Sequence, residues 1–264
     1  KASIYQASKN YDKAIELYNK ASLLNPQLAS THYALGYLYV LKNQYEKAIE
    51  EYNTALVISP NYSNAIYGLA KVYYDKGLYE RALTEYQKVL ELSPLNSGAY
   101  NNLGLTYYKL ENYDQAIHYF NQAIKIDNNN ANAYNNVGMI YYEMGLYKEA
   151  LKSYTAALKI LPDFAEANTN IGIVKCQLGQ LNEAEEHFKL ALKNNPSYAE
   201  PYKHIAQISL LLGDFDKANK NFRTYLKKSP NADDKTEITN QINEISAKLK
   251  EITLAQDTKK ILDN

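Results

Sequence analysis

The chain of 264 residues lacks tryptophan and has a single cysteine, Cys176. One cysteine excludes a disulfide within the chain and a zinc site built from several thiolates. The 29 Lys and Arg residues balance the 29 Asp and Glu residues, so the chain has no basic field that would attract nucleic acid. No apolar run approaches the roughly 20 residues that a membrane helix needs. We therefore expect neither nucleic-acid binding nor direct insertion into a membrane.

The sequence also lacks the motifs that accompany catalysis. It contains no P-loop, no G-x-G-x-x-G segment and no H-E-x-x-H segment. Its four histidines, His32, His118, His187 and His204, lie in different repeat units and far apart in sequence, so they indicate no metal-ligand cluster. The sequence therefore predicts a protein that is not an enzyme, with no catalytic residue, no metal site and no cofactor.

What the sequence does contain is a fixed period of about 34 residues, a length typical of repeat proteins. The segment AYNNLGLTYY begins at Ala99, and AYNNVGMIYY begins one period later at Ala133. Four columns carry the period: small residues (Ala2, Gly36, Ala70, Gly104, Gly138, Gly172, Ala206), alanines (Ala14, Ala48, Ala82, Ala116, Ala150, Ala184, Ala218), aromatic residues (Tyr18, Tyr52, Tyr86, Phe120, Tyr154, Phe188, Phe222) and mostly prolines (Pro26, Pro60, Pro94, Asn128, Pro162, Pro196, Pro230).

Each period has the pattern of two helices. In residues 65–77, Ile66, Leu69 and Tyr73 recur three and four residues apart, which is the helical period. Gly77 then offers a left-handed end to the first helix, and Gly145, Gly179, Gly213 and Asn43 repeat that stop. Proline cannot extend a helix, so Pro94 ends the second one. The small columns let the two helices approach closely while the aromatic column fills the space beside them.

These columns resemble the tetratricopeptide repeat, a helix–turn–helix unit with the pattern W-x2-L-G-x2-Y, A-x3-F and P. The chain shows YNNLGLTY at 100–107 and AIHYF at 116–120. The resemblance covers residues 1–232. It implies an all-α, right-handed superhelical solenoid of antiparallel helix pairs. We expect a partial unit at 1–28 and full units at 29–62, 63–96, 97–130, 131–164, 165–198 and 199–232.

After Asn231 the period stops and one amphipathic helix is expected within residues 233–264. Its apolar residues alternate at spacings of four and three: Ile238, Ile242, Ile245, Leu249 and Ile252. Asp233 and Asp234 stand where a helix N-cap belongs. The stripe predicts a capping helix that covers the last repeat. The alternative is a coiled-coil seam between two copies of the chain.

The resemblance implies that the first helices line a concave groove, and a ladder of side chains is expected there. Its members are an asparagine column (Asn102, Asn136, Asn170), an apolar column (Leu105, Met139, Ile173) and a tyrosine column (Tyr74, Tyr108, Tyr142). An asparagine amide has two donors and an acceptor, so it can hold a peptide N–H and C=O together. The ladder is similar to that in the repeat array of O-linked N-acetylglucosamine transferase. The alternative is that these asparagines only reflect the composition of an Asn-rich repeat protein.

The sequence therefore predicts an adaptor that binds an extended segment of a protein or peptide partner in the groove. Two alternatives stay open: a scaffold that assembles with itself, and the repeat module of a larger protein. Lys1 falls in the middle of an expected first helix, so the native N-terminus is expected to lie upstream. A homo-oligomer would use this cut unit or the C-terminal helix. With no cysteine pair, we expect a cytoplasmic protein, while a periplasmic location stays open.

Overall fold

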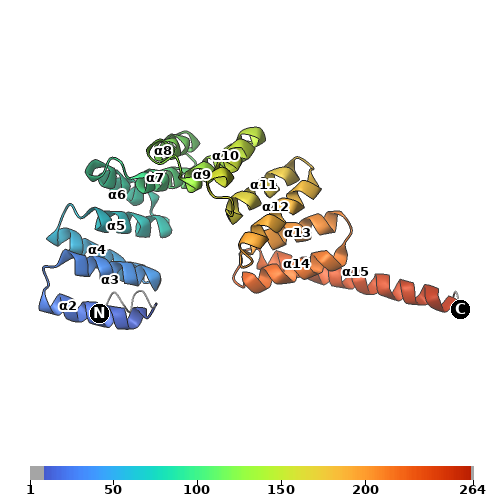
Figure 1. Cartoon of the computed structure of the whole chain (residues 1–264). Helices are drawn as coiled ribbons and strands as arrows, with labels where there is room; N and C mark the ends of the chain where they lie inside the picture. Colours follow the sequence, from blue (N-terminus) through green and yellow to red (C-terminus); the bar gives the residue numbers. More distant parts are fainter. Residues whose placement is uncertain (1–8, 263–264) are drawn as a thin grey trace. The chain divides into compact units, whose positions relative to one another are not determined.

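The computed structural model describes the backbone of residues 9–262 and the side chains of residues 9–256, so Ala2 of the small column and the expected helix at Lys1 lie outside the described residues. Within the described residues every regular element is an α-helix, and no strand occurs (Figure 1). This confirms the prediction of an all-α repeat fold. The helices are α2 (Tyr11–Leu24), α3 (Ala29–Leu41), α4 (Tyr45–Ile58), α5 (Ser63–Asp75), α6 (Tyr79–Leu92), α7 (Ser97–Lys109), α8 (Tyr113–Ile126), α9 (Ala131–Glu143), α10 (Tyr147–Ile160), α11 (Ala165–Gln177), α12 (Leu181–Asn194), α13 (Glu200–Leu211), α14 (Phe215–Lys228) and α15 (Lys235–Leu262).

The helices fall into two compact units, Lys1–Ile140 and Tyr141–Asn264, and each is described by itself. In the first unit, α3 packs on α4, α5 on α6 and α7 on α8, and each pair contacts the next through its neighbouring helices. In the second unit, α11 packs on α12 and α13 on α14 in the same manner. Each helix therefore contacts helices close to it in sequence, as expected of a repeat array.

The contact between the small column and the aromatic column forms the core of each helix pair. The rings of Tyr52, Phe120 and Phe188 are at most 1% exposed. A Cβ added to Gly104 would lie 2.6 Å from the ring of Phe120, and one added to Gly172 would lie 2.5 Å from the ring of Phe188. Only a residue without a side chain allows an aromatic ring so close to the backbone of the first helix.

The stops between the two helices of a pair have the expected left-handed backbone. Gly77 has φ +75° and Asn43 has φ 57°. In the unit at 97–130 the same position is held by Glu111, also with φ 57°, and in the partial unit by Lys9 with φ 59°. No sequence signal marks these two stops, because neither residue favours a left-handed conformation.

In two repeats, a polar residue stands at the position of the tryptophan in the tetratricopeptide pattern. It pairs with the residue 19 positions later, on the second helix. Nδ1 of His32 lies 2.7 Å from Glu51 Oε2, and its Nε2 lies 3.2 Å from the carbonyl oxygen of Pro26. Asn168 is 3% exposed, and its Oδ1 lies 3.2 Å from Nδ1 of His187. These pairs satisfy polar groups that would be costly to bury alone. His32 and His187 thus have structural roles in the packing of their helix pairs.

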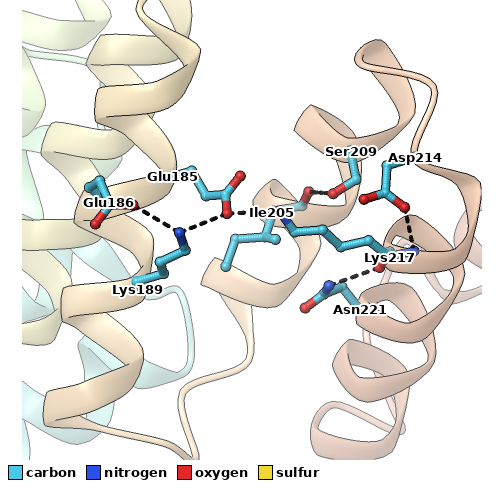
Figure 2. A network of polar contacts seen from close by, with 8 residues as sticks. All are labelled: Glu185, Glu186, Lys189, Ile205, Ser209, Asp214, Lys217 and Asn221. Carbon is cyan, nitrogen blue, oxygen red and sulfur yellow. Dashed lines mark hydrogen bonds and ion pairs between the residues drawn. The ribbon is translucent and has the colours of Figure 1, made fainter.

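Ion pairs link successive repeats. In the first unit, Lys42 pairs with Asp12 and Lys76 pairs with Glu46, and the two pairs occupy equivalent positions of successive repeats. In the second unit, Figure 2 shows Lys189 and Lys217 directed at the carboxylate of Glu185. The N–O distances are 3.0 Å from Lys189 and 2.8 Å from Lys217, so Glu185 connects α12 to α14.

The helix α15 packs on α14 and closes the C-terminal end of the second unit. Ile238, Ile242 and Ile245 are 2%, 5% and 4% exposed and lie in a core cluster with Phe222, and Leu249 packs at its margin. Ile252 is 38% exposed. The first half of the stripe thus behaves as a cap, whereas the covered surface ends near Leu249.

A polar cluster fastens the start of α15. Tyr225 donates its hydroxyl to Asp234 Oδ1 over 2.7 Å, and Lys203 Nζ lies 3.1 Å from Asp234 Oδ2. The same ammonium lies 2.9 Å from Glu200 Oε2. Burial raises the pKa of Asp234, but the hydrogen bonds from Tyr225 and Lys203 outweigh it and leave the pKa below its usual value. Asp234 therefore stabilises the docked helix as a carboxylate.

Among the described residues, none of the helices combines the length and the apolar composition needed to cross a membrane.

The glycine contact can be tested by changing Gly104 to Ala. We expect the free energy of unfolding to fall by about 1–3 kcal/mol, because the added methyl group overlaps the ring of Phe120. Gly98→Ala is the control, since its Cβ would meet only side-chain atoms at 3.3 Å and 3.4 Å, and we expect no loss of stability because alanine is the better helix former. Urea denaturation measures both. Equal losses in the two variants would contradict the proposed contact.

The cluster at Asp234 predicts a pH dependence. Asp234→Asn should lower the free energy of unfolding at pH 7 by about 1–3 kcal/mol, because an ion pair and a charged hydrogen bond are lost. The native pKa of Asp234 is lowered, so its contribution is present above the ordinary carboxyl pKa of about 3.9 and is lost as the pH falls below it. Denaturation at several pH values should show the two proteins converging in acid. A difference that stays constant would exclude the carboxylate as its source.

Candidate functional site

The predicted site residues all lie on first helices and are half-buried. The first unit contains Tyr74 on α5, then Asn102, Leu105 and Tyr108 on α7, then Asn136 and Met139 on α9. The second unit contains Tyr142 on α9 and Asn170 and Ile173 on α11. Each unit thus has its own part of the predicted ladder, and the first unit has the larger part.

A pocket of about 120 Å³ brings three of the predicted residues together in the first unit. Tyr74, Asn102 and Leu105 line it, from two successive first helices. Sequence reasoning missed the remaining lining residues, which are Lys71, Asp75 and Tyr86. Tyr86 was assigned only to the core column. Lys71 stands one period before Leu105, so periodicity could have found it, whereas Asp75 belongs to none of the columns described above. We name this site the α5–α7 pocket.

The α5–α7 pocket has uncharged tyrosine hydroxyls and two lining residues of opposite charge. Burial raises the pKa of Tyr86, and burial followed by the neighbouring Tyr79, Asp75 and Tyr108 raises the pKa of Tyr74. Both hydroxyls are therefore protonated at neutral pH and can donate hydrogen bonds. Burial raises the pKa of Asp75, while Lys71, one helical turn away, lowers it. One cation and one acid thus stand together beside the pocket.

The asparagine column has a structural role that the sequence did not reveal. Asn102 donates Nδ2 to the hydroxyl of Tyr67 over 2.8 Å, and Asn136 donates Nδ2 to Asn101 Oδ1 over 3.0 Å. Both bonds join one first helix to the preceding first helix, with an offset of 35 in residue number. In the second unit, Gln177 Nε2 donates to the Tyr142 hydroxyl over 3.3 Å with the same offset. The amides therefore hold neighbouring repeats in register.

The tyrosine column forms a repeated ring pair with the first residue of each second helix. The ring centroids of Tyr74 and Tyr79 lie 5.6 Å apart, and those of Tyr108 and Tyr113 lie 5.9 Å apart. In the second unit, the rings of Tyr142 and Tyr147 lie 5.8 Å apart. We call these three sets the tyrosine pairs.

The remaining candidates have other surroundings. Ile173 packs against a core cluster that contains Phe188 and Ile205, so at least part of its surface serves packing. Burial raises the pKa of Cys176, which disfavours the reactive thiolate. The ring of His204 stacks on Phe188 at 5.1 Å, and burial lowers the pKa of that imidazole. Across the described side chains, no group of three His, Cys, Asp or Glu residues is arranged to hold a metal ion.

The repeat pattern has relatives among known proteins. A family model described as tetratricopeptide repeat matches residues 62–129, 99–163 and 129–194. A second family model, described as TPR repeat, matches residues 2–43 and 36–77. None of the curated proteins matches the chain.

Three solved structures illustrate the structural likeness. A chain of the APC/C hetero-tetramer Cut9–Hcn1 is 19% identical with a TM-score of 0.76; the match covers 92% of this chain and 48% of that chain, so this chain spans about half its length. YrrB, described as a TPR protein with an unusual peptide-binding site, is 25% identical with a TM-score of 0.53, over 76% of this chain and 99% of YrrB. MamA is 28% identical with a TM-score of 0.53, over 65% of this chain and 94% of MamA. The likeness to the APC/C chain shows the fold alone, because so few residues are identical.

A double-mutant cycle tests the bond between Asn102 and Tyr67. We expect Asn102→Ala and Tyr67→Phe to be coupled by about 1 kcal/mol in the free energy of unfolding, the net worth of a hydrogen bond. Urea denaturation of the four proteins measures the coupling. As a control, Tyr67→Phe is combined with Asn136→Ala, which removes a different bond, and we expect the two effects to add. Additivity in the first cycle would show that the amide does not clamp the repeats.

Proposed function

The chain belongs to the tetratricopeptide repeat family, and we propose that it is a non-catalytic adaptor that holds an extended segment of a partner protein along its first helices. Tetratricopeptide repeats serve as protein-interaction modules, so an adaptor or scaffold is the general function of this fold. The observation that carries the finer proposal is the α5–α7 pocket. It gathers Tyr74, Asn102 and Leu105, which lie on two successive first helices.

The α5–α7 pocket has the composition of a peptide-recognition site. Leu105 and the rings of Tyr74 and Tyr86 supply an apolar lining for one side chain of the partner. The Asn102 amide and the phenol hydroxyls add polar groups that can fix the direction of the peptide backbone. Binding pockets are usually lined by apolar and aromatic side chains with a few polar groups, and the α5–α7 pocket has such a lining.

The clamp between repeats restrains the asparagine ladder before any peptide arrives. Because Asn102 and Asn136 each donate one N–H to the preceding helix, their side chains are held in one orientation. Side chains that are already ordered lose less conformational entropy on binding. We propose that these restrained amides also contact the peptide backbone, together with Asn170 in the second unit.

The strength of such a grip follows from its parts. A net hydrogen bond contributes about 1 kcal/mol, and a filled apolar pocket adds about 1.5–3 kcal/mol. These gains must exceed the cost of ordering an extended peptide. We therefore expect a transient grip, with a dissociation constant on the order of 1 μM.

YrrB supports the class of ligand. It is 25% identical to this chain and is described as having an unusual peptide-binding site. That description belongs to YrrB, and we extend to this chain only the proposal that a peptide is bound.

A self-assembling scaffold is the second candidate. The observation in its favour is that α15 extends beyond the surface of the last repeat that it covers. Ile252, the last residue of the apolar stripe, is 38% exposed on the part of the helix that follows the buried residues. Two such ends could associate as short amphipathic helices.

The proposed site can be tested by selecting binders from a library of random extended peptides. We expect the enriched peptides to lose affinity about tenfold or more for the Leu105→Asp variant, because a charge then occupies the apolar pocket. Leu95→Asp is the matched control, since Leu95 is 80% exposed and is not a lining residue of the pocket. Fluorescence anisotropy measures the affinities, and circular dichroism verifies that both variants fold.

Enriched peptides that bind both variants as tightly as the native chain would place the binding surface elsewhere. A library that yields no binder to the native chain would overturn the peptide-adaptor proposal and favour the scaffold.

A further inference from the structure

The helix α14 is the most basic of the described helices. Its cations are Lys217, Lys220, Arg223, Lys227 and Lys228. Asp216 is its one acid, so five positive charges against one negative charge give the helix a net charge of +4. The next most basic helix, α10, has three lysines and one glutamate, a net charge of +2. Because the whole chain is neutral, the excess on α14 is a local property of the second unit.

Two of the five cations on α14 have partners within the chain. Figure 2 shows Lys217 directed at Glu185 of α12, with an N–O distance of 2.8 Å. Lys228 Nζ lies 5.4 Å from the centre of the Tyr202 ring, in a cation–π contact. The other three side chains are exposed, and no ion pair joins them to a described acid. They are Lys220, Arg223 and Lys227.

These three cations lie on one face of α14. Their spacings of three and four residues place them within about 60° of one another around a helix of 3.6 residues per turn. We call Lys220, Arg223 and Lys227 the α14 basic face. Asp216 stands one turn before Lys220 on the same side, but no ion pair joins the two described side chains.

The acids of the neighbouring helices do not neutralise the α14 basic face. On α12, Glu183 pairs with a lysine of α11, and Glu185 and Glu186 pair with lysines of α12 and α14 other than those of the face. On α13, Glu200 pairs with Lys203. Among the described side chains, no ion pair joins an acid of α15 to α14. The α14 basic face is therefore left for a partner.

Arg223 is held in an orientation that suits a carboxylate. Its Nε donates to Asn219 Oδ1 over 3.0 Å, and no described residue accepts from its terminal nitrogens. A guanidinium has five N–H donors in a planar fork, so these two nitrogens can still bind both oxygens of one carboxylate. A side chain that is already restrained loses less conformational entropy on binding.

The surroundings of the α14 basic face select the class of partner. Every exposed side chain of α14 is charged, so the helix has no exposed apolar residue to enter a membrane. Its aromatic residues Phe222 and Tyr225 are buried in the core and cannot stack on nucleic-acid bases. A protein segment that is rich in Asp or Glu meets the face with complementary charge and nothing else is required of it.

We propose that the α14 basic face is a second docking surface, which binds an acidic segment of a partner protein. Arg223 makes a bidentate contact with one carboxylate, and Lys220 and Lys227 pair with further carboxylates along the helix. The inference goes beyond the proposed function, because it uses a second helix of the second unit and does not depend on the α5–α7 pocket.

The probe is a short fluorescein-labelled peptide in which glutamate alternates with serine, and its control has glutamine in place of glutamate. Fluorescence anisotropy is measured in about 100 mM salt, where screening confines charge effects to about 10 Å. We expect the native chain to bind the glutamate peptide about tenfold more tightly than the glutamine peptide. A triple variant, Lys220→Gln with Arg223→Gln and Lys227→Gln, should lose this preference. Arg223→Lys keeps the charge but cannot form the bidentate contact, so it should weaken binding about threefold.

The matched control is a second triple variant, Lys125→Gln with Lys148→Gln and Lys152→Gln. These lysines are exposed on α8 and α10 and have no ion pair with a described acid, so the change in net charge is the same. It should leave the preference for the glutamate peptide unchanged. Circular dichroism verifies that both triple variants fold.

Three results would overturn the inference. The first is equal affinity of the native chain for the two peptides, or binding of neither. The second is a preference that the α14 variant retains, or that the control variant also loses. The third is that duplex DNA or phosphatidylserine vesicles bind through the same three cations while the glutamate peptide does not, which would assign the face to another class of partner.

Discussion

The structure depends on the close approach of two helices at a residue that has little or no side chain. At Gly36, Gly104 and Gly172, the ring of an aromatic residue occupies the place where a Cβ would stand. This contact sets how deeply each second helix sits against its first helix. It also positions Tyr86, which occupies the same column as Phe120, so that its ring reaches the wall of the α5–α7 pocket. The pocket therefore follows from the packing that builds the repeat.

The sequence predicts most of the fold because its signals are local. The repeat columns, the helix ends at Asn43 and Gly77 and the apolar stripe of α15 each depend on residues that are near in sequence. The sequence did not predict the left-handed conformation of Glu111, because the two helices that this residue joins impose it. A glycine indicates a helix end because it readily adopts a positive φ. Another residue type that is forced into the same conformation gives no such signal in the sequence.

The site was predictable only in part, because its contacts cross from one repeat to the next. Tyr74, Asn102 and Leu105 were chosen by helix periodicity. Lys71 stands one period before Leu105 but was not assigned to the site, and Asp75 belongs to none of the repeat columns. The bond between Asn102 and Tyr67 has an offset of 35 in residue number, one more than the period. The two partners therefore belong to adjacent columns of neighbouring repeats, so no single column of the sequence displays the bond. The sequence pattern thus identified the asparagine column, but only the structure showed that its amides join successive first helices.

The contacts between repeats have a consequence for how such a chain could evolve. Each bond of this kind, including the ion pairs of Lys42 with Asp12 and Lys76 with Glu46, joins only adjacent units. Duplication of a whole unit would copy one set of contacts and leave the others intact, since nearest neighbours carry the coupling. The helix α15 differs, because Asp234 holds it to residues of the last unit alone. Internal duplication can therefore lengthen the array. The last repeat and α15, in contrast, must be kept together.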